Sequence, residues 1–422
     1  MREALPAELL HLLDTLAQER QRAGVAVYAV GGFVRDLLLS RPTADVDIVI
    51  EGDAIAFARR LAEQYGGGVE AHSDFGTATW TATTEGYPPF IDLVTARREL
   101  YPKPGALPVV QPSSIENDLR RRDFSINAMA IQLAPDFGTL LDPLGGESDL
   151  RAGVIRVLHT ASFIDDATRI FRAVRFEQRF NFHIAPETLA LIPAALPTLA
   201  EISGERLSHE LDLIFAEAEP ERAMRRLDEL GILQGTYPGL KFDEWQESAF
   251  GAVRTQPTPA IWTLNSVART ELFWIILGCR LTDVLGFARS MLMSAHLAGL
   301  LLEAQRLLKA LPQLAGKRQP SEVVSLLEGN EYSPQATLVA WLVAPDAERR
   351  EYVERFAAEW RLVRQTTTGD DLKALGLQPG PRFKVLLWEL RKAWLDGKVS
   401  SPEQERAYLG QLLGKDVHDD RR

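Results

Sequence analysis

The stretch VGGFVRDLLLSRPTADVDIVIEG, residues 30–52, contains two adjacent glycines, an Arg-Asp pair and two aspartates at alternate positions. Its hydrophobic pattern predicts a strand, a tight turn, a helix and a second strand. Glycines at a strand-to-helix turn let backbone N–H groups approach an anion such as phosphate. Taken alone, a tight turn beside a solvated strand edge is the more common explanation, so the other segments of the chain must be compared with it.

Five residues of this stretch are candidates for binding phosphate and metal. Gly31 and Gly32 occupy the predicted turn, and Arg35 adds a forked cation one helical turn further on. Asp45 and Asp47 lie two apart in a strand, so both side chains face the same side of the sheet. Adjacent carboxylates repel each other unless a cation lies between them, and Mg²⁺ combines few protein carboxylates with substrate phosphate oxygens. The pair therefore suits magnesium-assisted phosphoryl transfer.

Two further segments could complete such a site. Asp92, in FIDLVT, lies on a predicted neighbouring strand and could join the carboxylate cluster or act as a base. Arg120, Arg121 and Arg122 form the densest basic run of the chain, directly before Asp123. These cations could face the triphosphate of a nucleotide, although a solvated turn is the simpler interpretation of the run alone.

The segment SFIDDATRIFRAVRFEQRF, residues 162–180, is predicted to form one helix with Ser162 as its N-cap. At 100° per residue its apolar side chains share one face, and Arg169, Arg172 and Arg179 share the opposite face. The helix therefore carries a stripe of arginines.

Asp166 and Arg169 are three residues apart in this segment and would be neighbours on a helix surface. They could form an ordinary helical salt bridge. A carboxylate and a guanidinium also complement the base edge shared by cytosine and adenine, which presents an amino group beside an acceptor nitrogen. Uracil and guanine present a carbonyl and an N–H there, so the pair would admit C and A and reject U and G.

The whole chain is predicted to be an α+β protein. Short β-rich runs alternate with helices over the first ~150 residues and predict a mixed sheet, whereas helical spacing dominates from about residue 160 onward. A proline-containing segment between two of the strands, residues 96–123, is predicted as a long loop followed by a short helix. The predicted strands are 25–30, 45–50, 77–83, 89–95 and 126–133.

Composition limits the possible classes of protein. The chain has 422 residues, 46% hydrophobic and 25% charged, which indicates several soluble globular domains. A single cysteine, Cys279, excludes an internal disulfide framework and a multi-cysteine zinc site, and is typical of a reducing cytoplasm. No apolar run reaches membrane-spanning length without charges. The net charge of −11 would repel RNA, so any RNA binding must use a local basic patch.

Five motifs in a fixed order carry a resemblance to a known family. They are GGFVRD with DVD, RRDFSINAMA, LDPLGGESDLRAGVIRVL, DDATRIFRAVRF and GERLSHEL, and they span residues 30–210. Together they resemble the class II tRNA nucleotidyltransferases and poly(A) polymerases, a branch of the polymerase-β-like nucleotidyltransferases. The resemblance implies a catalytic head with a mixed sheet followed by an all-helical neck, body and tail, here 1–150, 151–220, 221–345 and 346–422.

The resemblance also implies roles for individual residues and partners. Asp45 and Asp47 would bind Mg²⁺, and both, with Asp92, would be catalytic. The neck would recognise the base and the tRNA end, and the tail would contact tRNA. ATP and/or CTP would be the substrates and the 3′ end of tRNA the acceptor, in the cytoplasm, with neither DNA nor a membrane as a partner. The nucleotide-binding residues would be Gly31, Gly32, Arg35, Arg122, Asp123, Asn127, Asp166, Arg169, Arg172 and Arg175.

Several alternatives remain open at this point. The chain has Asp165 where the family usually has Glu, and the segment ELYPKPGALPVV lacks the arginines of many CCA-adding members. Addition of C-C-A, of C-C only or of A only therefore all stay possible. A poly(A) polymerase would tend to carry a basic C-terminal extension, whereas the C-terminal region of this chain, with EGNEYS, DAERREYVE and KDVHDDRR, is mixed in charge. A catalytically silent RNA- or nucleotide-binding protein is the alternative outside catalysis.

Overall fold

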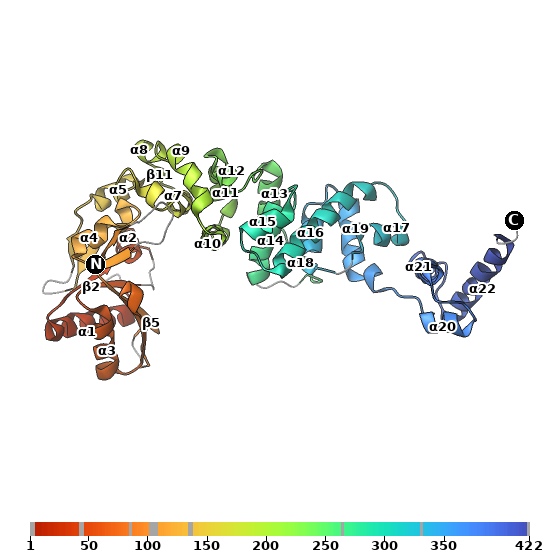
Figure 1. The fold of residues 1–422 in the computed structure, drawn as a ribbon, viewed down its shortest axis with the longest axis horizontal. Coiled ribbons are helices and arrows are strands. Elements are labelled where there is room, and N and C mark those ends of the chain that lie inside the picture. The colour runs from red at the N-terminus through yellow and green to blue at the C-terminus, as the bar shows by residue number, and fades with distance from the viewer. Residues whose placement is uncertain are drawn as a thin grey trace. The chain divides into compact units, whose positions relative to one another are not determined.

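A computed structural model of the chain divides into two compact units, Met1–Pro238 and Gly239–Arg422 (Figure 1). It describes residues 5–41, 46–83, 87–100, 109–133, 138–262, 266–329 and 332–419. All of the described strands belong to the first unit, and the described part of the second unit contains only helices and their connections. The predicted α+β class is therefore confirmed.

The first unit is built around a seven-stranded sheet with the order β3-β4-β5-β2-β1-β8-β9. Strands β2 and β5 are parallel and the other neighbours are antiparallel, so the predicted mixed sheet is confirmed. The strands are β1 (Ala26–Val30), β2 (Asp47–Glu51), β3 (Gly68–His72), β4 (Thr77–Thr81), β5 (Phe90–Thr95), β8 (Ala130–Gln132) and β9 (Thr139–Leu141).

Burial alternates along the central strands. In β5, Ile91 and Leu93 are fully buried, whereas Phe90 and Asp92 are exposed. Trp80 of β4 is also fully buried, and helix α3 (Ala54–Tyr65) packs against both strands. One face of β4 and β5 therefore forms core with α3, and the other face is open. The remaining helices of this part are α1 (Ala7–Ala23), α2 (Gly32–Leu38), α4 (Ile115–Arg120) and α5 (Gly146–Ala152).

Four of the five predicted strands are confirmed with small shifts at their ends, as β1, β2, β4 and β5. Within the predicted strand 126–133, only Ala130–Gln132 is extended, because Ser125–Asn127 forms a 3₁₀ turn. The predicted long loop at 96–123 is wrong in part. Two antiparallel strands, β6 (Arg97–Leu100) and β7 (Val109–Pro112), pair there, while residues 101–108 lie outside the described residues.

The prediction of one helix over residues 162–180 is wrong. The segment forms α6 (Ser162–Asp165) and α7 (Thr168–Phe180), because Asp166 is extended with φ −146° and ψ 100°. Its carboxylate accepts hydrogen bonds from the backbone N–H of Thr168 at 3.1 Å and from the Thr168 hydroxyl at 2.7 Å. An aspartate bonded two residues ahead favours a turn over a continuous helix. Ser162 is not an N-cap either, because Ala161 occupies that position.

The rest of the first unit is mainly helical. Strands β10 (Val154–Ile155) and β11 (His183–Ile184) form a small parallel pair beside α7. The following helices are α8 (Pro186–Leu189), α9 (Ile192–Ala195), α10 (Gly204–Phe215), α11 (Pro220–Glu229) and α12 (Ile232–Thr236).

The second unit is a series of helices. Among the described residues of the chain, no helix is both long and apolar enough to cross a membrane. The helices are α13 (Glu244–Thr255), α14 (Ser266–Gly278), α15 (Val284–Ser290), α16 (Ala295–Ala310), α17 (Pro320–Leu327), α18 (Pro334–Leu342), α19 (Ala347–Ala358), α20 (Gly369–Ala374), α21 (Pro381–Leu395) and α22 (Pro402–Asp419).

Candidate active site

An open cavity of about 560 Å³ lies within the first unit and collects most of the predicted site residues. Asp92 does not line this cavity but lies on the sheet beside Asp47, and Asp45 lies outside the described residues. The predicted residues that line the cavity are Gly31, Gly32, Arg35, Asp47, Arg122, Asp123, Asn127, Asp166, Arg169, Arg172 and Arg175.

The turn at Gly31 forms one end of the cavity. Strand β1 ends at Val30, and Gly31 adopts φ +67° and ψ −128° before α2 begins. A Cβ atom at Gly31 would lie 2.6 Å from a guanidinium nitrogen of Arg122 and 3.7 Å from an Asp47 carboxylate oxygen. Glycine is therefore required here, both for the backbone angle and for the close approach of a cation and an acid.

Asp47 and Asp92 form the acidic part of the site. They are register partners on the parallel strands β2 and β5, and both are exposed on the open face of the sheet. The Thr79 hydroxyl donates to an Asp92 oxygen at 2.6 Å. Carboxylate oxygens are the ligands preferred by hard divalent cations, so the chemistry of these groups fits such an ion. The described residues, which do not include Asp45, hold no cluster of three or more metal-ligating side chains.

The arginine run is held by a buried acid. Asp118 is fully buried and accepts from Arg121 Nε at 2.9 Å and from an Arg122 NH2 group at 3.0 Å. Burial acts to raise the pKa of Asp118, but the two guanidinium groups lower it below its usual value. Arg120, at the end of α4, is the exposed residue of the run, and Arg121 and Arg122 line the cavity.

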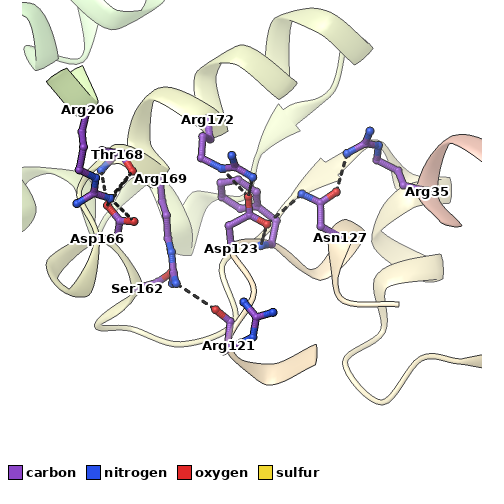
Figure 2. A network of polar contacts seen from close by, with 11 residues as sticks. Arg35, Arg121, Asp123, Asn127, Ser162, Asp166, Thr168, Arg169, Arg172 and Arg206 are labelled. Carbon is purple, nitrogen blue, oxygen red and sulfur yellow. Dashed lines mark hydrogen bonds and ion pairs between the residues drawn. The ribbon is translucent and has the colours of Figure 1, made fainter. Parts of the chain in front are cut away.

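A chain of hydrogen bonds connects several residues that line the cavity (Figure 2). Arg35 donates to the side-chain oxygen Oδ1 of Asn127 at 2.6 Å, and the side-chain nitrogen Nδ2 of Asn127 donates to Asp123 Oδ1 at 3.0 Å. Arg172 donates to the other Asp123 oxygen through Nε at 2.8 Å and NH2 at 2.6 Å. Burial opposes ionisation of Asp123, yet the ion pair with Arg172 holds its pKa below the usual range. The network fixes two arginines from α2 and α7 around one buried carboxylate.

The two residues predicted to read the base have different partners in the structure. Both Asp166 oxygens accept from one Arg206 NH2 group at 2.8 Å, and Arg169 donates to Ser162 Oγ at 2.7 Å and to the Arg121 carbonyl at 3.1 Å (Figure 2). Arg169 is only 6% exposed, so it does not lie on a solvated stripe. Each residue is held separately at the cavity wall, which leaves the base-reading role a prediction.

Sequence reasoning missed several residues of the cavity. Arg206 and Glu210 come from α10, and the motif GERLSHEL contained them without indicating a role. Glu210 is 6% exposed; burial raises its pKa, while Arg172 and Arg175 act to lower it. Glu99 reaches the same cavity from β6 and pairs with Arg121 at 3.0 Å. The position of Glu99 could not be predicted because the segment was expected to be a loop.

Paired carboxylates on the open face of a sheet, beside an arginine-lined cavity, are the arrangement expected of a nucleotide-transferring protein. The family model of the poly A polymerase head domain matches residues 27–156. A second model, the probable RNA and SrmB-binding site of polymerase A, matches residues 181–243.

Three curated relatives resemble almost the whole chain. An A-adding tRNA nucleotidyltransferase of Halalkalibacterium halodurans is 34% identical, and the match covers 98% of this chain and 95% of that protein. A second A-adding enzyme, from Geobacter sulfurreducens, is 36% identical over 96% of this chain but only 47% of its own length, so this chain spans about half of that relative. A CC-adding tRNA nucleotidyltransferase of Deinococcus radiodurans is 34% identical over 91% of this chain and 89% of its own.

Two solved structures have the same fold. A CCA-adding enzyme in an apo form has a TM-score of 0.81 and 32% identity, with 98% of this chain and 97% of that chain covered. The Thermotoga maritima CCA-adding enzyme complexed with tRNA has a TM-score of 0.75 and 30% identity over 97% of both chains. The chain therefore belongs to the tRNA nucleotidyltransferase and poly(A) polymerase family, as the five motifs suggested. The roles of single residues and the four-part division of the chain stay predictions.

Proposed function

We propose that this protein transfers AMP from ATP to the 3′ end of a tRNA that already ends in C-C. The observation that carries the proposal is that Gly31, Asp47 and Arg122, which would bind phosphate, line the same cavity as Asp166 and Arg169, which would bind the base. The choice of AMP is supported by two A-adding relatives that match nearly the whole chain.

In this reaction the 3′-hydroxyl of the tRNA attacks the α-phosphorus of ATP, a new P–O bond forms, and the bond to the β-phosphate breaks to release pyrophosphate. Asp45 and Asp47 would hold Mg²⁺, which when bound neutralises charge on the phosphate oxygens. Arg122 is oriented by Asp118 toward the turn at Gly31, where the triphosphate would lie. Asp92, the register partner of Asp47, would accept the proton that the hydroxyl loses.

At the other end of the cavity, Asp166 would accept from the adenine amino group and Arg169 would donate to the adjacent ring nitrogen. Cytosine offers the same edge, so this pair by itself does not separate ATP from CTP. The Deinococcus CC-adding relative, with 34% identity, keeps CC addition as the second candidate function.

The deciding experiment supplies ATP and CTP separately to two tRNA transcripts, one ending at the discriminator base and one ending in C-C. We expect AMP transfer to the C-C transcript and no CMP transfer to either. CMP transfer to the shorter transcript would assign CC addition, a long ladder of A would assign a poly(A) polymerase, and no pyrophosphate release would favour a binding protein.

The Asp47→Asn variant and treatment with EDTA test the chemistry. Both should abolish AMP transfer while tRNA binding in a filter assay stays within about threefold, because a transition-state contact contributes little to ground-state affinity. Restoration of the EDTA-treated enzyme by Mg²⁺ is expected. Undiminished turnover of Asp47→Asn would overturn the proposed metal site.

A further inference from the structure

Phe90 is an unusual residue of the central sheet. Its side chain, at the start of β5, is 67% exposed. Ile91 and Leu93 of the same strand, which face the other side of the sheet, are fully buried. In the described strands of the seven-stranded sheet, it is the only large apolar side chain with substantial exposure. Burying a phenyl ring would contribute on the order of 2 kcal/mol to the stability of the fold. Because Phe90 is exposed, it does not make this contribution to the core.

Phe90 lies on the same open face as the carboxylates. Side chains two apart in a strand share a face, which places Phe90 beside Asp92, with Cα atoms roughly 7 Å apart. The register pairs Phe90 with Thr81 and Asp92 with both Thr79 and Asp47. The ring is thus two residues along the strand from Asp92, on the same face of the sheet.

The order of the strands indicates from which side of the open face each substrate would approach. Asp47 on β2 lies between β1, which ends beside Gly31, and β5, which carries Asp92 and Phe90. Arg122 lies close to Gly31, so the cation that would receive the phosphates is on the β1 side. In phosphoryl transfer the attacking and leaving oxygens are roughly in line on opposite sides of the phosphorus. If pyrophosphate leaves on the β1 side, the attacking hydroxyl must approach from the β5 side.

We propose that Phe90 stacks on the base of the 3′-terminal nucleotide of the acceptor RNA and so holds its 3′-hydroxyl beside Asp92. This inference rests on the proposed transfer to an RNA end and adds the site of the acceptor nucleotide. Asp47, Asp92 and the exposed Glu70 make this face acidic, which disfavours binding through RNA phosphates. An aromatic ring can bind a base there without a cation, and such stacking contributes about 1–3 kcal/mol per base.

Kinetics with separate substrates test the proposal. Phe90→Ala should lower kcat/KM for tRNA by roughly 5- to 150-fold, which is the stacking energy converted at 1.36 kcal/mol per tenfold. The KM for ATP should stay within about twofold, and the melting temperature should not change because the ring is exposed. Phe90→Trp should restore most of the activity. The matched control is Phe75→Ala, which removes another exposed phenyl ring of the same unit, 42% exposed, and should behave as wild type.

A binding assay separates this inference from the proposed function. The full-length protein is mixed with a tRNA whose terminal nucleotide carries pyrrolocytosine, whose fluorescence is quenched by stacking. Wild type, Phe90→Trp and Phe75→Ala should quench the probe, and Phe90→Ala should not. Equal quenching by wild type and Phe90→Ala would overturn the inference, even if AMP transfer is intact. Quenching that depends on Phe90 without any AMP transfer would support the inference and overturn the proposed function.

Discussion

Three arginines of the cavity donate to acids that are almost completely buried. Arg121 and Arg122 donate to Asp118, which has no exposed surface, and Arg172 donates to Asp123, which is 8% exposed. Charge-assisted bonds to a buried carboxylate fix the direction of a guanidinium group before a ligand arrives. Phosphate oxygens that bind there would then meet donors that need little reorganisation, and such preorganisation is a large part of electrostatic catalysis.

Arg206 is predicted to position the base-reading acid. Arg206→Ala removes the donor to both Asp166 oxygens, and we expect the KM for ATP to rise about tenfold or more, since bonds to charged groups contribute roughly 1.5–3 kcal/mol. The ratio of ATP to UTP incorporation should fall as well, because a mobile Asp166 selects less strictly. Arg222→Ala, which breaks an exposed pair with Glu219, is the control. An unchanged ATP:UTP ratio would refute the positioning role.

Substitution of Asp123 is predicted to lower the stability of the fold more than substitution of any other acid of the network. Asp123→Asn removes the charge of the buried carboxylate that accepts both Arg172 hydrogen bonds, and the free energy of unfolding of the first unit should fall by about 3–5 kcal/mol. Urea denaturation measures this value. Glu229→Gln, which removes a largely exposed partner of Arg226, should change it by less than about 1 kcal/mol. Equal effects of the two substitutions would show that the Asp123 network is not a stabilising centre.

At the scale of elements, short breaks in regular structure place the functional groups. The extended conformation of Asp166 separates α6 from α7 and directs its carboxylate to Arg206 on α10. The turn at Gly31 likewise separates β1 from α2. A continuous helix over 162–180 would have left Asp166 paired along its own surface. The break therefore decides which side chain faces the cavity.

In the second unit, the side chain of Glu405 connects α22 with the segment at Thr366 and Thr367 and with α21. Glu405 has no exposed surface and accepts from the backbone N–H groups of Thr366 at 2.8 Å and Thr367 at 2.6 Å, and also from the Trp394 indole. Burial alone would raise the pKa of Glu405, but these donors lower it to about 2. Because the folded pKa is depressed, its stabilisation is complete above the usual pKa of 4.5 and is lost as pH falls toward about 2.

Glu405→Gln should therefore destabilise the second unit near neutral pH by on the order of 1–3 kcal/mol. The difference from wild type should shrink as the pH falls below the usual carboxyl pKa, since protonation makes the two side chains alike. Urea midpoints monitored by tryptophan fluorescence at several pH values measure both effects. Glu403→Gln, at an exposed position of the same helix, is the control. Parallel pH profiles of wild type and Glu405→Gln would contradict the assignment.

At the scale of the whole molecule, the cavity belongs to one unit. All its lining residues lie between Gly31 and Glu210, within the unit that ends at Pro238. The whole chain has a net charge of −11, whereas the cavity is lined by many arginines. Both are possible because buried carboxylates pair with arginines of the cavity. Nucleotide binding and the folding of the helical second unit should therefore be separable.

A fragment of residues 1–238 tests this separation. We expect it to fold and to bind ATP with a Kd within about fivefold of the full chain, measured by calorimetry. AMP transfer to tRNA should fall far more, because the tRNA contacts predicted for the second unit would be missing. The complementary fragment 239–422 should show no ATP binding. A folded 1–238 fragment that cannot bind ATP would show that the nucleotide site needs the second unit.

The sequence alone determined four strands of the central sheet, the glycine turn, the α+β class and the family, because hydrophobic periodicity and ordered motifs are local or linear properties. It also indicated that Asp47, Arg122, Asp123 and Asp166 belong to one site. Only the tertiary structure decided their partners. Arg206 meets Asp166 across 40 positions of sequence, and Arg172 meets Asp123 across 49, and no local pattern encodes such contacts. The exposure of Phe90 likewise depends on which face of the sheet α3 covers, which is a property of packing.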